Sequence, residues 1–370
     1  MILLTHKPRF MLIGLVLPRT DKERTLADFE EAQSLVHTYG GEVFAAVSQN
    51  STRRDQSTFI GTGKAHEVVD TITKEKIDIV VINDNVKPGQ LFTLKKIFEV
   101  GNPRIEVWDR ADLILHIFSK HASTAEAKLQ IKLAFMRHMG PRIYGMGMEL
   151  SQQAGGIGTV GIGETNTERM QRHWRQEVRS VRKQLAKLEA NRSNQMDTRK
   201  KSGLSTISII GYTNAGKTTL FNALASEHKL VDNALFVTLD SNVSKLYLPK
   251  IQKEVYLTDT IGFIQNLPPQ LIDAFKSTLM ETIRADTLLH MIDASDIWMD
   301  DKIQAVEEIL QDLRIDTTNQ IYVFNKIDRA KNINKQELIK RYSAFHPQFV
   351  SAYSRQGIPQ LLAAIQELLP

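Results

Sequence analysis

Residues 211–218 read Gly-Tyr-Thr-Asn-Ala-Gly-Lys-Thr, which is a complete GxxxxGK[ST] phosphate-binding loop. The loop directly follows a strand-like apolar run at residues 207–210, and a helix-forming run begins at Thr219. In a strand–loop–helix unit of this kind, successive backbone N–H groups converge on phosphate at the helix N-terminus. The sequence therefore requires an α/β domain with a nucleotide site at the carboxyl ends of its strands.

The side chains of this loop have different expected roles. Lys217 can reach the β- and γ-phosphates, which makes it a catalytic as well as a binding candidate. The hydroxyl of Thr218 is expected to bind Mg²⁺. The loop residues that we expect to contact the nucleotide are Asn214, Ala215, Gly216, Lys217, Thr218 and Thr219.

A second motif, Asp259-Thr260-Ile261-Gly262, follows the apolar segment 255–257. Asp259 stands where a carboxylate would bind Mg²⁺ through water, and the N–H of Gly262 would be available to the γ-phosphate, so Gly262 is also a catalytic candidate. A DxxG sequence alone is weak evidence, because Asp and Gly are common in turns. Its position after the phosphate loop gives it weight.

A third motif, Asn325-Lys326-Ile327-Asp328, follows another buried-strand pattern. The Asp328 carboxylate can accept two hydrogen bonds from guanine, whereas adenine offers no such pair. Asn325 and Lys326 are expected to hold the loop and cover the base. Ser351 and Ala352 fit the remaining base-contacting loop. The three motifs, in this order, predict a site for GTP or GDP with Mg²⁺.

Two positions leave alternatives open. Thr238 lies between the first two motifs, where a hydroxyl would bind Mg²⁺ and sense the γ-phosphate, but it also fits an ordinary strand threonine. Asn214 stands where potassium-activated GTPases carry asparagine, so K⁺ is a candidate cofactor; a polar residue that stabilises the local turn explains it equally well. Phe263 follows the DxxG motif, where a glutamine commonly orients water, and its side chain cannot form hydrogen bonds. We therefore expect slow intrinsic hydrolysis that a partner stimulates.

The composition fits a protein of a reducing compartment. It has 370 residues, no cysteine and a net charge of +5, with neither a signal peptide nor a membrane-spanning stretch expected. We expect a cytoplasmic monomer. Positive charge is concentrated in one helix-forming span, which fits either a solvated helix face or a surface for a polyanion such as RNA. The basic residues of that span are Arg169, Arg172, Arg175, Arg179, Arg182, Lys183, Lys187, Arg192, Arg199, Lys200 and Lys201.

We expect three regions. Residues 1–122 predict an N-terminal α/β domain with a mostly parallel sheet, in which the sequence Gly-Thr-Gly-Lys at 61–64 is better explained as a helix start than as a second nucleotide site. Residues 123–201 predict a long antiparallel helical hairpin, with one helix from Thr124 to Met139 and another from Thr165 to about Asn191. Residues 202–370 predict a doubly wound GTPase domain.

The order of these pieces resembles the HflX family of GTPases, within the Obg–HflX group, over nearly the whole chain. The matching segments are the runs at 61–64, 126–130 and 141–142, the glycine-rich pieces 155–159 and 163–165, the phosphate loop 211–218 and the segment 259–264. The resemblance implies a protein that binds the large ribosomal subunit and its RNA, and that acts in splitting or rescuing stalled ribosomes under stress. Val160, Ile162 and the segment 241–244 depart from the family pattern.

Two other functions remain in view. The first is a nucleotide-gated RNA- or ribosome-binding switch with negligible hydrolysis, which Phe263 and the altered segment 241–244 favour. The second is an ATP-driven RNA remodelling enzyme, which would need a nucleotide site in residues 10–122.

Overall fold

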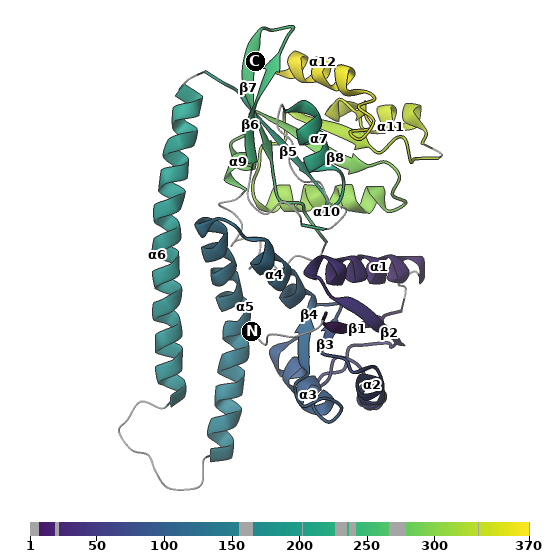
Figure 1. The fold of residues 1–370 in the computed structure, drawn as a ribbon, viewed down its shortest axis with the longest axis vertical. Coiled ribbons are helices and arrows are strands. Elements are labelled where there is room, and N and C mark those ends of the chain that lie inside the picture. The colour runs from purple at the N-terminus through teal and green to yellow at the C-terminus, as the bar shows by residue number, and fades with distance from the viewer. Residues whose placement is uncertain are drawn as a thin grey trace. The chain divides into compact units, whose positions relative to one another are not determined.

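The computed structural model describes residues 7–18, 22–154, 166–201, 203–225, 235–236, 242–265, 279–331 and 333–369 (Figure 1). The chain divides into two compact units. The first consists mainly of residues 7–120 and 129–185, and the second consists mainly of residues 121–128 and those from 186 onward. Among the described residues, no helix combines the length and the apolar character needed to cross a membrane.

The first unit contains a four-stranded parallel sheet with the strand order β2-β1-β3-β4. Its strands are β1 (Arg9–Val16), β2 (Glu42–Asn50), β3 (Ile79–Ile82) and β4 (Glu106–Asp109). Its connecting helices are α1 (Lys22–Tyr39), α2 (Thr62–Glu75), α3 (Pro88–Phe98) and α4 (Arg110–His121). The expected α/β fold with a parallel sheet is confirmed. Gly61 caps α2, and Lys64 in its first turn forms an ion pair with Glu67.

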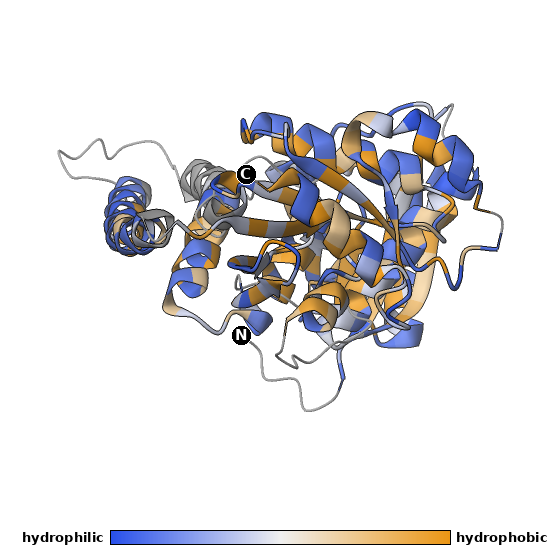
Figure 2. Ribbon diagram, turned by 90° about the horizontal axis from the view of Figure 1, so that it is seen from above, coloured by the Kyte–Doolittle hydropathy of each residue, from blue (hydrophilic) through white to orange (hydrophobic). Residues whose placement is uncertain are grey.

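Two long helices follow, α5 (Ala125–Ala154) and α6 (Asn166–Lys201). Within the first unit they pack through Leu133 and Met136 of α5 against Val181 and Leu185 of α6, which are all buried. The rest of α6 is largely hydrophilic (Figure 2), and such a helix gains its stability mainly from an apolar face of this kind.

Both helices are longer than the sequence indicated. The prediction that Gly140 and Pro141 end the first helix was wrong, because α5 continues to Ala154. A proline removes one backbone hydrogen bond from a helix, and a long helix tolerates that loss when its other backbone hydrogen bonds are formed. The second helix runs on to Lys201, and its expected first residue, Thr165, lies outside the described residues.

The second unit contains a six-stranded sheet with the order β10-β9-β8-β5-β7-β6. Its strands are β5 (Thr206–Gly211), β6 (Asn242–Leu248), β7 (Lys253–Asp259), β8 (Thr287–Asp293), β9 (Gln320–Asn325) and β10 (Gln348–Phe349). The described helices are α7 (Lys217–Leu224), α9 (Met280–Ile283), α10 (Met299–Asp312), α11 (Lys335–Arg341) and α12 (Ile358–Leu368). All neighbouring strands are parallel except β6, which pairs antiparallel with β7.

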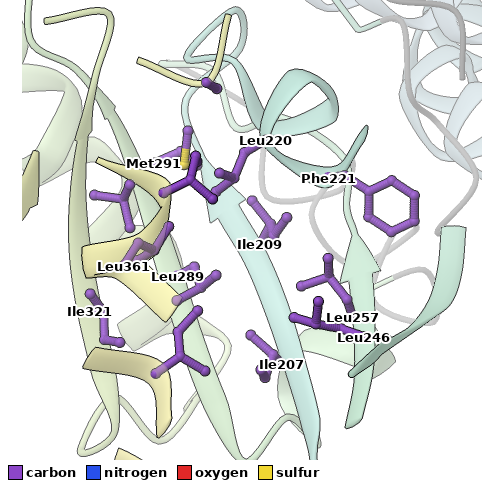
Figure 3. Close-up of a cluster of buried hydrophobic side chains, with 14 of the residues drawn as sticks. Ile207, Ile209, Leu220, Phe221, Leu246, Leu257, Leu289, Met291, Ile321 and Leu361 are labelled. Atoms are coloured by element: carbon purple, nitrogen blue, oxygen red, sulfur yellow. The ribbon is translucent and has the colours of Figure 1, made fainter. Parts of the chain in front are cut away.

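The core of this unit lies between the sheet and α7 and α12 (Figure 3). Ile207 and Ile209 of β5 and Leu289 of β8 are fully buried, and they contact Leu220 of α7 and Leu361 of α12 within the same cluster. Central parallel strands are covered on both faces, which explains their nearly continuous apolar sequences. This packing fixes the carboxyl ends of β5, β7, β8 and β9, from which the candidate site is built.

Candidate nucleotide-binding site

The phosphate loop connects β5 to α7, and its backbone adopts conformations that favour glycine. Gly211 has φ +141° and Gly216 has φ +95°. A β-carbon on Gly211 would lie 2.3 Å from the Met291 carbonyl oxygen, and one on Gly216 would lie 2.2 Å from Asn325 Nδ2. Both positions therefore exclude any side chain. Asn214 also adopts a left-handed conformation, with φ +62°, and its side chain is exposed, as asparagine tolerates better than most residues.

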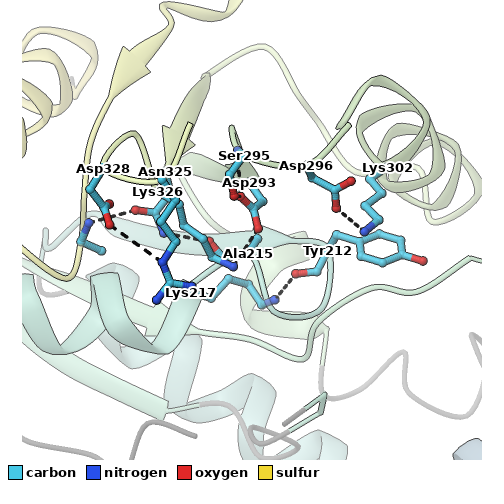
Figure 4. Close-up of polar contacts among 12 residues, drawn as sticks. Tyr212, Ala215, Lys217, Asp293, Ser295, Asp296, Lys302, Asn325, Lys326 and Asp328 are labelled. Atoms are coloured by element: carbon cyan, nitrogen blue, oxygen red, sulfur yellow. Dashed lines mark hydrogen bonds and ion pairs between the residues drawn. The ribbon is translucent and has the colours of Figure 1, made fainter. Parts of the chain in front are cut away.

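Lys217 is buried at the first position of α7, with its ammonium group inside the loop (Figure 4). Its Nζ donates to the carbonyl oxygens of Gly211, at 3.1 Å, and Tyr212, at 2.7 Å. Burial lowers the pKa of Lys217 to about 8; the charge of Asp259 opposes this shift and that of Lys326 adds to it. A negatively charged ligand would reverse the effect, because it favours the charged ammonium form.

The candidate Mg²⁺ ligands come together at the ends of β7 and the phosphate loop. Thr218 Oγ1 donates to Asp259 Oδ2 at 2.9 Å, and Asp259 is completely buried. A hydroxyl and a carboxylate oxygen this close suit a hard cation such as Mg²⁺, which prefers oxygen ligands. The residues present thus fit the ion that the motifs imply.

The DxxG segment lies directly against the phosphate loop. Phe263 donates its N–H to the Gly211 carbonyl at 3.0 Å, and the Phe263 carbonyl accepts from the Thr213 N–H at 2.7 Å. A β-carbon on Gly262 would lie 2.8 Å from Lys217 Nζ. The Phe263 side chain is 3% exposed. It therefore packs inside the domain, in the position where a water-orienting side chain would be expected.

Asn325 connects the base-side segments to the phosphate loop. Its Nδ2 donates to the Ala215 carbonyl at 2.8 Å, and its Oδ1 accepts from the Ala352 N–H at 2.9 Å. Since Asn325 is 3% exposed, each of these bonds is protected from water. Ser351 is fully buried beside Ala352. One side chain thus holds together three loops that are far apart in the sequence.

The Lys326 and Asp328 side chains lie beside Asn325 (Figure 4) and are partly exposed. Lys326 has φ +61°, and its Nζ lies 2.7 Å from Asp293 Oδ2. Asp328 is exposed, and its Oδ2 lies 3.9 Å from Arg329 Nε. Asp328 is therefore accessible to a ligand.

Sequence reasoning missed Asp293, which positions Lys326. The available signal was an acidic residue at the end of the apolar run 287–293. Sequence reasoning also missed the Tyr212 hydroxyl, which accepts from the N–H of Gln265 at 3.0 Å. Of the expected site residues, the structure brings together those of the phosphate loop, the DxxG segment and residues 325–328 and 351–352. Thr238 lies outside the described residues. Thr219 follows Thr218 in the first turn of α7.

Strand order, phosphate loop and buried core together define a P-loop GTPase domain. Three family models match the chain: "GTP-binding GTPase N-terminal" at residues 27–119, "GTP-binding GTPase Middle Region" at 121–199, and "50S ribosome-binding GTPase" at 206–326. The chain belongs to the HflX family of GTPases, as its curated relatives establish.

The GTPase HflX of Caldanaerobacter subterraneus subsp. tengcongensis is 38% identical over 98% of this chain and 81% of its own length. The GTPase HflX of Escherichia coli is 34% identical over 94% of this chain and 80% of its own length. Among solved structures, a GTP-binding protein from Sulfolobus solfataricus in complex with GDP has a TM-score of 0.51 at 23% identity, covering 98% of each chain. That likeness concerns the fold.

Proposed function

We propose that this chain is a cytoplasmic GTPase that binds the large ribosomal subunit, hydrolyses GTP to GDP and phosphate, and splits or rescues stalled ribosomes under stress. The observation that carries the proposal is the Asn325 bridge. Asn325 belongs to the segment 325–328, which we propose reads guanine, and it bonds to the phosphate loop and to the loop at Ala352. The surrounding domain matches the "50S ribosome-binding GTPase" model.

In this proposal each motif has a separate task. The loop N–H groups and Lys217 bind the β- and γ-phosphates, the Gly262 N–H donates to the γ-phosphate, and Asp328 accepts from guanine. Thr218 and Asp259 would hold Mg²⁺, which supplies charge neutralisation across the phosphate oxygens when bound. Thr238 is proposed as a further Mg²⁺- and γ-phosphate-sensing residue.

The partner surface is proposed to be the basic face of α6. Its cationic side chains from Arg169 to Lys187 are exposed, and an acidic residue on the same helix, Glu177, is already paired with Lys132 at 2.7 Å. We expect the excess of positive charge on this exposed face to attract RNA phosphates. The glycine-rich segment next to it lies outside the described residues.

One observation favours the second candidate, a nucleotide-gated switch with negligible hydrolysis. Phe263 is buried and its backbone is hydrogen-bonded to the phosphate loop. The phenyl ring of Phe263 cannot hydrogen-bond to water, so hydrolysis needs another group to orient the attacking water. A ribosomal partner or a K⁺ ion near Asn214 would meet that need. Equal rates in K⁺ and Na⁺ at matched ionic strength would remove the K⁺ hypothesis.

The deciding experiment measures GTP and ATP hydrolysis by the purified chain, with and without large ribosomal subunits. Slow GTP hydrolysis that subunits accelerate at least tenfold, with no comparable ATP hydrolysis, would support the proposal. Nucleotide-dependent binding to subunits without acceleration would instead support the switch. Small subunits at equal concentration serve as the control for nonspecific RNA effects.

A further inference from the structure

Tyr212, the second residue of the phosphate loop, has a side chain whose place in the domain is closely determined. Its ring is 5% exposed, and Lys302 of α10 places its Nζ 5.0 Å from the ring centroid (Figure 4). Lys302 is paired with Asp296, whose Oδ1 accepts from the Trp298 N–H at 2.8 Å. An aromatic ring attracts a cation held within about 6 Å of its face. Burial and this contact together restrict the ring, so the hydroxyl of Tyr212 has a set direction.

That hydroxyl meets the segment that follows the DxxG motif. Its oxygen accepts from the Gln265 N–H at 3.0 Å. Two backbone bonds link the same segment to the loop at Phe263, whose N–H donates to the Gly211 carbonyl at 3.0 Å and whose carbonyl accepts from the Thr213 N–H at 2.7 Å. Residues 263–265 are therefore attached to the phosphate loop by the backbone at one end and by the Tyr212 hydroxyl at the other.

This attachment bears on Gly262, the residue just before it. A β-carbon on Gly262 would lie 3.0 Å from Thr213 Cα, so the glycine backbone passes directly against the loop. The chain before Gly262 is held by β7, which ends at Asp259, and the chain after it is held at Phe263 and Gln265. A hydrogen-bond donor contributes most to binding and catalysis when its position is set before the ligand arrives.

We propose that Tyr212 is a positioning residue for GTP. Its hydroxyl holds the backbone at Gln265, and in this way it keeps the N–H of Gly262 where it can donate to the γ-phosphate. The inference rests on the proposed function of Gly262. Because GDP lacks the γ-phosphate, Tyr212 raises the affinity for GTP and leaves that for GDP unchanged. Since coupling between two interactions is reciprocal, a bound γ-phosphate also strengthens the bond between Tyr212 and Gln265.

The test compares the full-length chain with Tyr212→Phe, which removes the hydroxyl and keeps the ring next to Lys302. Equilibrium titrations with GDP and with a GTP analogue that cannot be hydrolysed give the two affinities. We expect Tyr212→Phe to bind the analogue more weakly by about fivefold, as the loss of one hydrogen bond predicts, and to bind GDP as the unmodified chain does. Tyr247→Phe, at an exposed tyrosine of β6 in the same unit, is the matched control and should change neither affinity.

Two results would overturn the proposal. A loss of affinity for GDP as large as that for the analogue would show that Tyr212 only supports the fold of the loop. An unchanged affinity for the analogue would show that the bond to Gln265 does not influence the γ-phosphate side. If Tyr212→Phe does not fold, amide hydrogen exchange of the unmodified chain decides. Slower exchange of the Gln265 N–H with the analogue than with GDP supports the positioning role, and equal exchange overturns it.

The proposed function is tested separately. Acceleration of GTP hydrolysis by large ribosomal subunits is measured on the unmodified chain, whereas both affinities and the amide exchange are measured without subunits and without hydrolysis. A chain that subunits fail to stimulate would therefore contradict the proposed function and leave the affinity comparison for Tyr212 intact.

Discussion

The side-chain amide of Asn325 lies 2.8 Å from the carbonyl oxygen of Ala215, so the end of β9 is fastened to the phosphate loop. Asn325→Ala removes this bond and the one to Ala352, and it leaves buried backbone groups unsatisfied. We expect a loss of about 1–3 kcal/mol in unfolding free energy and weaker binding of both GTP and GDP. Urea denaturation and nucleotide titration measure these effects. Asn85→Ala, at an exposed position of the first unit, should change neither.

Gly262 has no room for a side chain next to Lys217. A β-carbon there would lie 2.8 Å from Lys217 Nζ and 2.9 Å from Thr213 Cγ2. Gly262→Ala should therefore lower GTP hydrolysis at least tenfold. It should weaken GTP binding more than GDP binding, because the Gly262 N–H is proposed to contact the γ-phosphate, which GDP lacks. Gly63→Ala is the matched control, because a β-carbon on Gly63 meets no atom within 4 Å. Equal loss of GDP and GTP affinity would contradict the assigned role of Gly262.

Asp328 is accessible in the structure, as a base-reading carboxylate must be. In Asp328→Asn the side-chain amide can donate to the extra carbonyl of xanthine and no longer accepts two bonds from guanine. We expect affinity to shift by at least tenfold from GTP toward xanthosine triphosphate. Competition binding with both nucleotides measures the shift. Asp312→Asn, on the exposed surface of α10, should have no effect, and an unchanged preference in Asp328→Asn would show that another group reads the base.

Arg179 and Arg182 are exposed and lie on neighbouring positions of one face of α6. If they contact RNA phosphates, replacing both by alanine should reduce the slope of log affinity for large subunits against log salt by about 1.5. The measurement is subunit binding across a salt series. Replacing the exposed Lys331 and Lys340 of the second unit by alanine is the charge-matched control. Parallel salt dependences for both double variants would remove α6 from the interface.

Glu307 carries a pH-dependent part of the stability. Burial alone would raise its pKa, but hydrogen bonds from His290, Gln320 and Tyr322 and the charge of His290 outweigh burial and hold it below the usual 4.5. A lowered pKa stabilises the fold above pH 4.5, and this stabilisation disappears as the pH falls through the folded-state value. Glu307→Gln should thus be less stable than the unmodified chain at pH 7, with a gap that narrows below pH 4.5.

Urea midpoints at several pH values measure that gap. Glu308→Gln changes the exposed neighbour and should follow the unmodified chain throughout. A gap for Glu307→Gln that stays constant down to the lowest pH at which both proteins fold would contradict the assignment.

Much of the fold could be predicted, because central parallel strands are recognisable in the sequence as uninterrupted apolar runs. β6 was missed for the opposite reason. It is an edge strand in which only Leu246 and Leu248 are buried, and its pattern of alternation is short. The extension of α5 through Pro141 was missed because a single proline removes one backbone hydrogen bond and does not always end a helix. At the site, the motifs indicated the residues, whereas the pairing of Lys326 with Asp293 depends on the register of β8 and β9, which local sequence does not determine.

The pairing of β6 with β7 has a consequence for Asp259. Asn242, the first residue of β6, is the register partner of Asp259, and Ile209 of β5 is its partner on the other side. The backbone of this proposed Mg²⁺ ligand is therefore held between a central strand and an edge strand. A slip in the register of the edge strand would disturb the nucleotide site directly, although no residue of β6 belongs to one of the three motifs.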